Sequence, residues 1–164
     1  MKKFLLAVVA VLCVTVVSAQ EHKNSIGLRL GYGAELQYER HFSAENYLEV
    51  NLGLSGFGGD RVFVNGTYNW NLCDWDWTPS AGRWFLSAGV GGSLGLWGYD
   101  KALEDGTVKR GHGFQVGVAG DVAFGIRFNA PVTLSIDYRP TIYFLHGAWG
   151  DGFTSFALTC TYNF

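Results

Sequence analysis

The residues of this chain that could carry chemistry are few and widely spaced. None of its histidines stands at a metal-ligand spacing from another histidine or a cysteine; they are His22, His41, His112 and His146. The strongest catalytic candidate is the stretch 41–45, which offers a base, a hydroxyl and a carboxylate in His41, Ser43 and Glu45. A catalytic set must converge on one reacting atom, and a hairpin turn does not achieve this. We predict a turn with a capping serine, no catalytic residue, no metal site and no cofactor.

Two further features suggest chemistry that the surrounding sequence does not support. The glycine-rich segment 89–95 is not followed by the helix that a phosphate-binding loop needs, so we expect small inward residues in a narrow interior. Cys73 and Cys160 invite a disulfide if the protein is exported. We expect none, because the strand assignment below puts them on opposite walls, beyond the ~7 Å Cα separation that a bridge allows.

The composition limits the elements that must position these residues. Only 16% of the 164 residues are charged, aromatics make up another 16%, and glycine occurs 23 times. Soluble globular proteins carry roughly 25% charged residues. Abundant glycine and aromatics favour β-structure over helical bundles or disorder. The net charge of −2, without a basic run, argues against nucleic acid as a partner.

The N-terminus has the pattern of an export signal. Two lysines precede an apolar run from Phe4 to Val17, and Ser18 and Ala19 supply small residues for cleavage before Gln20. The run is about 14 residues long, which is short of the ~20 that a membrane anchor needs. We predict a cleaved signal peptide at 1–19 and one mature domain at 20–164.

Alternation of apolar and small polar residues dominates the mature chain. In the final segment Phe156, Leu158 and Cys160 alternate with alanine and threonine, and the same split recurs upstream with the apolar side on even numbers. We predict eight strands, at 25–32, 34–42, 47–56, 61–71, 84–98, 112–128, 132–146 and 153–164. One long first strand is the alternative, because alternation is unbroken from Ile26 to Tyr38; we divide it at 31–33, where glycines permit a tight turn.

A soluble lipocalin-like barrel and a membrane barrel share this pattern and differ in which face looks outward. The odd-numbered face is mostly glycine, serine, alanine, threonine and asparagine, which suits a narrow lumen. The even-numbered face is rich in leucine, valine, isoleucine and phenylalanine, which suits lipid. We predict an all-β, eight-stranded antiparallel up-and-down transmembrane β-barrel. Its aromatic girdle is expected to include Trp70, Trp84, Phe128 and Tyr138.

The odd-numbered face also carries charges that must share the lumen. We expect a network of Arg29, Glu35, Glu39, Glu49, Arg61, Asp121, Arg127, Asp137 and Arg139. The near balance of sign favours a plug over an ion path. A three-residue turn at 129–131 sets Asp121 opposite Arg139, whereas the neighbouring register opposes Asp121 to Asp137, and opposed like charges are destabilising. We therefore expect an Asp121–Arg139 pair, and Asp121→Ala to destabilise more than removal of both partners.

The chain resembles the small eight-stranded outer-membrane barrels of Gram-negative bacteria, of the OmpA/OmpX type, and the outer-membrane β-barrel domain family. The likeness covers residues 24–164, and its carriers are the segments 26–31, 33–38, 130–140 and 162–164. Tyr162 and Phe164 resemble the C-terminal signal of such barrels, although many relatives carry arginine where Asn163 stands here. The resemblance implies residence in the outer membrane among its lipids. It also implies the barrel assembly machinery and periplasmic chaperones as partners during biogenesis.

Two connections between the strands are unusual. The turn 71–83 is long for the periplasmic side and carries Trp75 and Trp77, which we expect to anchor at the membrane interface. The segment 100–111 mixes acidic and basic residues, which predicts a solvated loop or a surface for a partner.

Three functions fit these observations. We favour a non-enzymatic monomeric barrel that acts in envelope integrity or surface interaction. A narrow pore for ions or small solutes is the alternative, although eight strands leave an interior that side chains just fill. A lipid-modifying outer-membrane enzyme is the third, because deacylases and palmitoyltransferases exist among barrels of this size.

Overall fold

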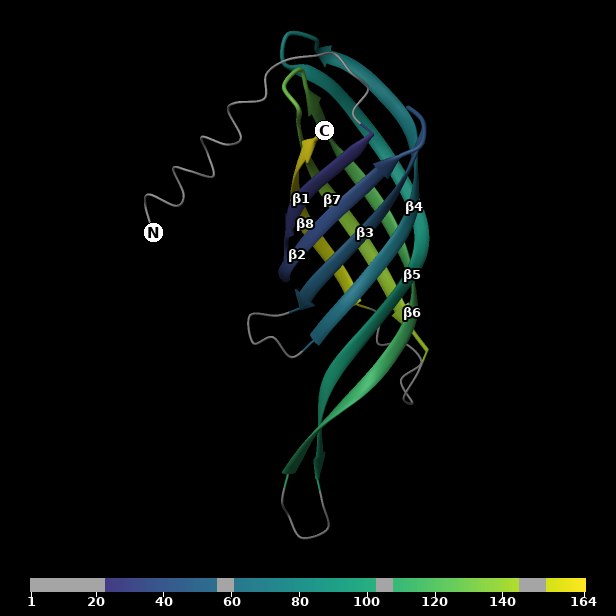
Figure 1. Ribbon diagram of the computed structural model, residues 1–164, viewed down its shortest axis with the longest axis vertical. Coiled ribbons are helices and arrows are strands. Elements are labelled where there is room, and N and C mark those ends of the chain that lie inside the picture. Colours follow the sequence, from purple (N-terminus) through teal and green to yellow (C-terminus); the bar gives the residue numbers. More distant parts are fainter. Residues whose placement is uncertain (1–22, 56–60, 103–107, 145–152) are drawn as a thin grey trace, which may run out of the picture.

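The computed structural model describes residues 23–55, 61–102, 108–144 and 153–164 and shows a closed β-barrel (Figure 1). Each strand pairs antiparallel with the next, and β8 closes the barrel on β1. The predicted eight-stranded antiparallel barrel is confirmed. The strands are β1 (Asn24–Leu30), β2 (Gly33–His41), β3 (Asn46–Ser55), β4 (Arg61–Thr78), β5 (Gly82–Ala102), β6 (Val108–Phe128), β7 (Val132–Tyr143) and β8 (Phe153–Asn163).

The two ends of the barrel differ. The start of β1, the end of β8 and the turns 42–45, 79–81 and 129–131 lie at one end, which we call the termini end. The turn 31–32 and the ends of β3, β5 and β7 lie at the other, the loop end, where β5 and β6 run on beyond the other strands (Figure 1). Within the described ranges no helix is long and apolar enough to cross a membrane. The expected signal peptide at 1–19, His22 and His146 lie outside these ranges.

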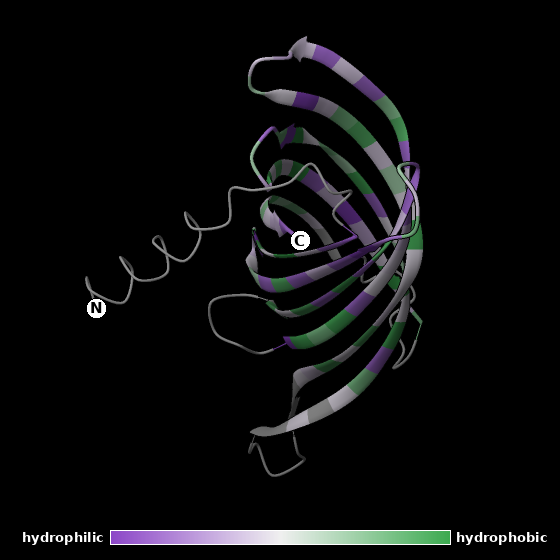
Figure 2. Cartoon of the chain, turned by 45° about the horizontal axis from the view of Figure 1, so that its top comes forward, coloured by the Kyte–Doolittle hydropathy of each residue, from purple (hydrophilic) through white to green (hydrophobic). Residues whose placement is uncertain are grey.

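The two faces of the wall follow the predicted alternation over most of the barrel. Odd-numbered residues such as Arg29, Asn51 and Asp137 point inward and are buried, while Leu28 and Ile136 beside them are exposed on the outer wall. Polar and apolar bands accordingly alternate along the strands (Figure 2). Large apolar side chains on the outside and polar ones inside are the arrangement of a membrane barrel and the reverse of a soluble one.

Two local predictions about strand ends and pairing are confirmed. β1 ends at Leu30 and β2 begins at Gly33, so the chain turns at the glycine pair instead of forming one long strand. Between β6 and β7, Ala123 lies opposite Asp137 and Gly125 opposite Ser135, which is the register expected from a three-residue turn at 129–131.

The predicted end of the fourth strand is wrong. β4 continues to Thr78, and the turn to β5 occupies only 79–81 instead of 71–83. The register shifts between Asn71 and Cys73, so one extra residue bulges out of the ladder and the alternation reverses beyond it. Trp75 therefore pairs with Trp84 on the outer face although its number is odd. A prediction that assumes a single parity assigns the residues just beyond such a bulge to the wrong face of the barrel.

The lengths of three other strands also differ from prediction. β5 runs to Ala102 and β6 begins at Val108, with Asp100 opposite Arg110, so most of the charged segment 100–111 is strand. This part of the hairpin extends past the barrel and has no lumen to face, so apolar alternation does not mark it. β7 ends at Tyr143 instead of 146.

Candidate functional site

Two buried arginines stand in the middle of the lumen. Arg139 on β7 is 2% exposed and bonds carboxylates from three strands. Its Nε donates to Asp121 Oδ1 at 3.0 Å and its Nη1 to Glu35 Oε2 at 3.0 Å, while Nη2 pairs with Glu49. The guanidinium therefore connects β2, β3, β6 and β7 across the interior.

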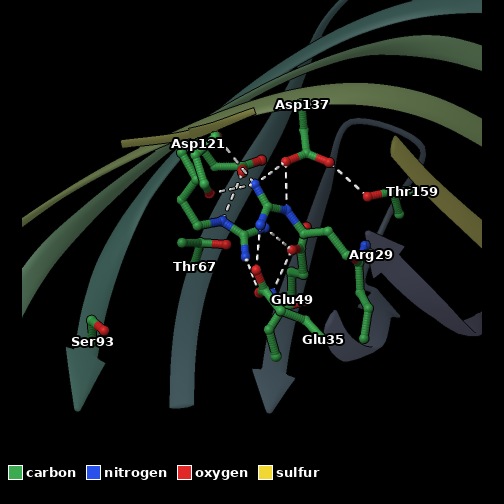
Figure 3. A network of polar contacts seen from close by, with 12 residues as sticks. Arg29, Glu35, Glu49, Thr67, Ser93, Asp121, Asp137 and Thr159 are labelled. Atoms are coloured by element: carbon green, nitrogen blue, oxygen red, sulfur yellow. Dashed lines mark hydrogen bonds and ion pairs between the residues drawn. The ribbon is translucent and has the colours of Figure 1, made fainter. Parts of the chain in front are cut away.

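Arg29 on β1 extends the same cluster (Figure 3). Its Nε donates to Asp137 Oδ1 at 2.6 Å, and its Nη1 pairs with Glu35, which thus bridges both guanidiniums. Thr159 donates to the second oxygen of Asp137 at 2.6 Å. We call this set the central ion cluster: Arg29, Glu35, Glu49, Asp121, Asp137 and Arg139.

The other three charges expected in the network lie elsewhere in the lumen. Arg61 stacks over the Trp97 ring at 4.2 Å, and Arg127 pairs with Asp74 at 3.1 Å. Glu39 accepts from Gln37 Nε2 at 2.7 Å. The near balance of sign applies to all nine charges together, whereas within the central ion cluster four carboxylates face two guanidiniums.

Buried amides and aromatics line the lumen beside the cluster, and the sequence analysis did not single them out. Asn51 Nδ2 donates to Glu49 at 2.6 Å. Tyr47 shares a hydrogen bond of 3.0 Å with Ser87 near the termini end, and Tyr143 shares one of 2.9 Å with Ser93 toward the loop end. Their odd numbers were the available signal, because an aromatic on the odd-numbered face must point into the barrel.

A cavity of about 650 Å³ occupies the termini-end half of the lumen. The ion cluster contributes to its floor through Glu49, Asp121 and Arg139, and the turns 42–45 and 129–131 contribute to its rim. Its walls include Gln37, Glu39, Tyr47, Phe85 and Thr161.

The hydrogen bonds found in the segment 41–45 do not join His41, Ser43 and Glu45 to one another through their side chains. Ser43 Oγ accepts a hydrogen bond from the Glu45 backbone N–H at 3.1 Å, which is the expected capping role. His41 Nε2 lies 3.0 Å from Glu39 Oε2 and is thus engaged with the lumen. No group of three or more histidine, cysteine or acidic side chains in the described part of the chain is placed to hold a metal ion.

The two cysteines are free and exposed, Cys73 on β4 and Cys160 on β8. Three strands separate β4 from β8 in either direction around the barrel.

Comparisons with known proteins agree with this architecture. No protein-family model and no curated protein matches the chain. Among solved structures, the N-terminal β-barrel domain of Pseudomonas aeruginosa OprF matches with a TM-score of 0.58 and 13% identity, over 86% of this chain and 95% of that one. The chain has the fold of an eight-stranded outer-membrane β-barrel. A de novo designed transmembrane β-barrel matches with a TM-score of 0.51 and 12% identity, over 90% and 100% of the two chains. Ail of Yersinia pestis matches with a TM-score of 0.43 and 13% identity, over 86% and 96%.

The outer wall of the barrel carries aromatics at its termini end. Trp70 and Phe128 lie where β3 and β5 begin, opposite Asn46 and Gly82. Trp84 belongs to an outward cluster in which its ring stacks on Phe124 at 5.4 Å and lies 5.9 Å from that of Trp77; Trp75 stacks on Trp77 at 5.2 Å. Tyr138 lies instead in the middle of β7, opposite Phe156, and is outside this ring.

The C-terminal residues close the wall of the barrel. The backbone of Phe164 exchanges two hydrogen bonds with Asn24, at 2.8 and 3.0 Å. Asn163 points inward, where it accepts from Ser25 at 2.8 Å and donates to Thr133 at 3.0 Å. Asparagine at this position therefore joins β8 to both of its neighbours.

Proposed function

We propose that this chain is a non-enzymatic, monomeric protein of the bacterial outer membrane that acts in envelope integrity or surface interaction and whose lumen is closed by side chains. The central ion cluster carries this proposal. Arg29 and Arg139 would be costly to bury without partners, and together they bond carboxylates from the four strands β2, β3, β6 and β7. Such a cluster ties the walls together and obstructs a path for ions.

Side chains on the loop-end side of the cluster support a closed lumen. Toward the loop end, the Trp97 ring packs edge-on against Tyr143 at 4.4 Å between centroids, and Phe63 and Tyr143 are buried. The guanidinium of Arg61 lies over the Trp97 ring in the same layer. An eight-stranded barrel has an interior of a size that such side chains fill.

A narrow pore is the second candidate, and the termini-end cavity favours it. A pore would require the cavity to continue past Arg139, which lines its floor. An enzyme has less support, because His41, Ser43 and Glu45 do not converge. Incubation of the folded barrel with labelled lipid A tests this third function, and we expect the lipid to be recovered unchanged.

The proposed location and role can be tested in the source bacterium. We expect the protein in the outer-membrane fraction of a density gradient, and we expect a deletion strain to take up a hydrophobic dye faster until the wild-type gene is restored. Recovery in the inner-membrane or soluble fraction contradicts the location. Unchanged dye uptake in the deletion strain contradicts the integrity role and leaves surface interaction.

The barrel assembly machinery and periplasmic chaperones are the proposed partners during biogenesis, and Tyr162 and Phe164 the proposed signal. Removal of Phe164 would also remove its two backbone bonds to Asn24. Phe164→Ala keeps those bonds, so a fall in assembly in cells with normal refolding in detergent is the result expected of a recognition signal.

A further inference from the structure

We propose that the termini-end cavity is a binding site for a small aliphatic amine in its protonated form. The cavity, its charge and its unsatisfied acceptors carry this inference. It goes beyond the proposed role in the envelope and does not depend on it.

The charges around the cavity leave a negative excess. Glu39 lines the wall, and the central ion cluster below it holds four carboxylates and two guanidiniums. The five carboxylates therefore exceed the two guanidiniums by three charges when all are ionised. Arg127 and Arg83 at the rim pair with Asp74 and Asp76 and do not offset this excess, whereas Lys23 at the rim lowers it from three charges to two.

Glu39 is the carboxylate with the weakest compensation. It lies directly opposite Glu49 on the adjacent strand, an arrangement that is unfavourable for like charges. Arg139 bonds Glu49, whereas the partners of Glu39 in the described chain are the amide of Gln37 and the ring of His41. A cation bound beside Glu39 would relieve the repulsion and supply a counter-charge of the kind that Arg139 gives to Glu49.

Two buried acceptors in the cavity wall also lack partners. Gln37 is 4% exposed, and its Oε1 has no hydrogen-bond partner among the described residues, while its Nε2 is committed to Glu39. Thr161 is 2% exposed, and its Oγ1 is likewise unpartnered there. An alkylammonium group has three N–H donors and no acceptor, so it complements a carboxylate with an amide oxygen beside it.

The size and walls of the cavity favour an organic cation over a metal ion. About 650 Å³ is within the range of small-molecule sites and far exceeds the space of one ion. Tyr47 and Phe85 supply apolar surface for a short carbon chain. Arg127 already lies 4.0 Å over the Phe85 ring, which shows that a cation fits against an aromatic face of this wall. The carboxylates are separated by guanidiniums, and no metal-holding group is found in the described chain.

The test uses the folded mature barrel in detergent micelles and 1,4-diaminobutane as the probe. Titration calorimetry at low salt should show saturable binding of the diamine. The neutral 1,4-butanediol and the anionic succinate have the same number of carbons and should show none. Equal binding of the diol, or no binding of the diamine, would overturn the proposal.

Two variants place the site. Glu39→Gln keeps the shape of the side chain and removes its charge, and we expect affinity for the diamine to fall about tenfold or more. The matched control is Glu45→Gln, which removes one charge from an exposed turn at the same end and should leave affinity unchanged. Equal losses in both variants would indicate general charge attraction and overturn the site.

A spectroscopic measurement on the wild-type barrel covers the case in which Glu39→Gln does not fold. The side-chain amide signal of Gln37 should shift on addition of the diamine and saturate with the calorimetric affinity. The amide of Asn24, whose Oδ1 accepts from Tyr38 and Arg40 outside the cavity, is the internal reference. Shifts confined to surface residues, with Gln37 unmoved, would contradict binding in the cavity.

Discussion

At the scale of single residues, Arg139 bonds more carboxylates than any other side chain in the described part of the lumen. It bonds Glu35, Glu49 and Asp121, and only Glu35 has a second arginine as partner. The sequence predicted the Asp121–Arg139 contact because it follows from register and parity, and the 3.0 Å bond confirms it. It could not predict the partners of Glu39, Arg61 and Arg127, because these depend on side-chain reach across the lumen and on the bulge that turns Asp74 inward.

This connectivity gives the first prediction. Arg139→Ala leaves Glu49 and Asp121 buried without their cation, so we expect a loss of about 3–5 kcal/mol in the free energy of unfolding. Asp121→Ala should cost less, because Arg139 retains two carboxylates. Urea unfolding in lipid vesicles measures both, and Arg83→Ala, at an exposed pair with Asp76, is the control that should change little. A smaller loss for Arg139→Ala than for Asp121→Ala would contradict the arrangement.

The same bonds reverse an expectation drawn from the sequence. If Asp121 and Arg139 formed an isolated pair, removing both residues would lower the stability of the barrel less than removing Asp121 alone. Because Arg139 also bonds Glu35 and Glu49, removal of both residues still leaves Glu49 without its cation. We now expect the double variant to be less stable than Asp121→Ala in the same urea titration. A double variant as stable as Asp121→Ala would indicate an isolated pair.

At the scale of the strands, alternation predicted the number of strands and the face of most residues, because a wall between lipid and lumen imposes a period of two. It failed where that constraint ends. β4 loses the parity at its bulge, and the ends of β5 and β6 extend beyond the lumen. The charged residues in these ends of β5 and β6 resemble the composition of a loop.

The close approach of β4 and β5 gives a second prediction. A Cβ on Gly91 would lie 1.9 Å from the backbone oxygen of Gly66, whereas a Cβ on Gly66 would meet nothing within 4 Å. Gly91→Ala must push the strands apart, and we expect a cost of about 1–3 kcal/mol. Gly66→Ala in the same hairpin is the matched control and should change stability by no more than ~0.5 kcal/mol. Equal effects in urea unfolding would show that the two strands are not this close.

The outward face of β7 gives a third prediction. Ile136 is 61% exposed and lies between Phe124 and Leu158 on the neighbouring strands. If this face meets lipid, Ile136→Arg should cost about 2–4 kcal/mol in vesicles, the range for arginine near the bilayer midplane. Ala44→Arg adds the same charge to an exposed turn and should be nearly neutral. A neutral Ile136→Arg would place this face in water.

At the scale of the whole molecule, an apolar outer wall and a charged interior define a membrane barrel, and the resemblance to outer-membrane barrels predicted the fold that the solved structures share. The cavity could not be foreseen, because it depends on how far each inward side chain reaches. The ion cluster lies at the floor of this cavity, and a pore would have to continue past it.

Conductance of the refolded wild-type barrel in a planar bilayer tests the closed lumen most directly. We predict no stable current steps, because Arg29, Arg139 and their carboxylates cross the interior. Insertion is verified in the same sample by protection of the strands from protease, so that an absence of current reflects a closed barrel and not a failure to insert. Stable, repeated steps from the wild-type protein would contradict the account and establish a pore.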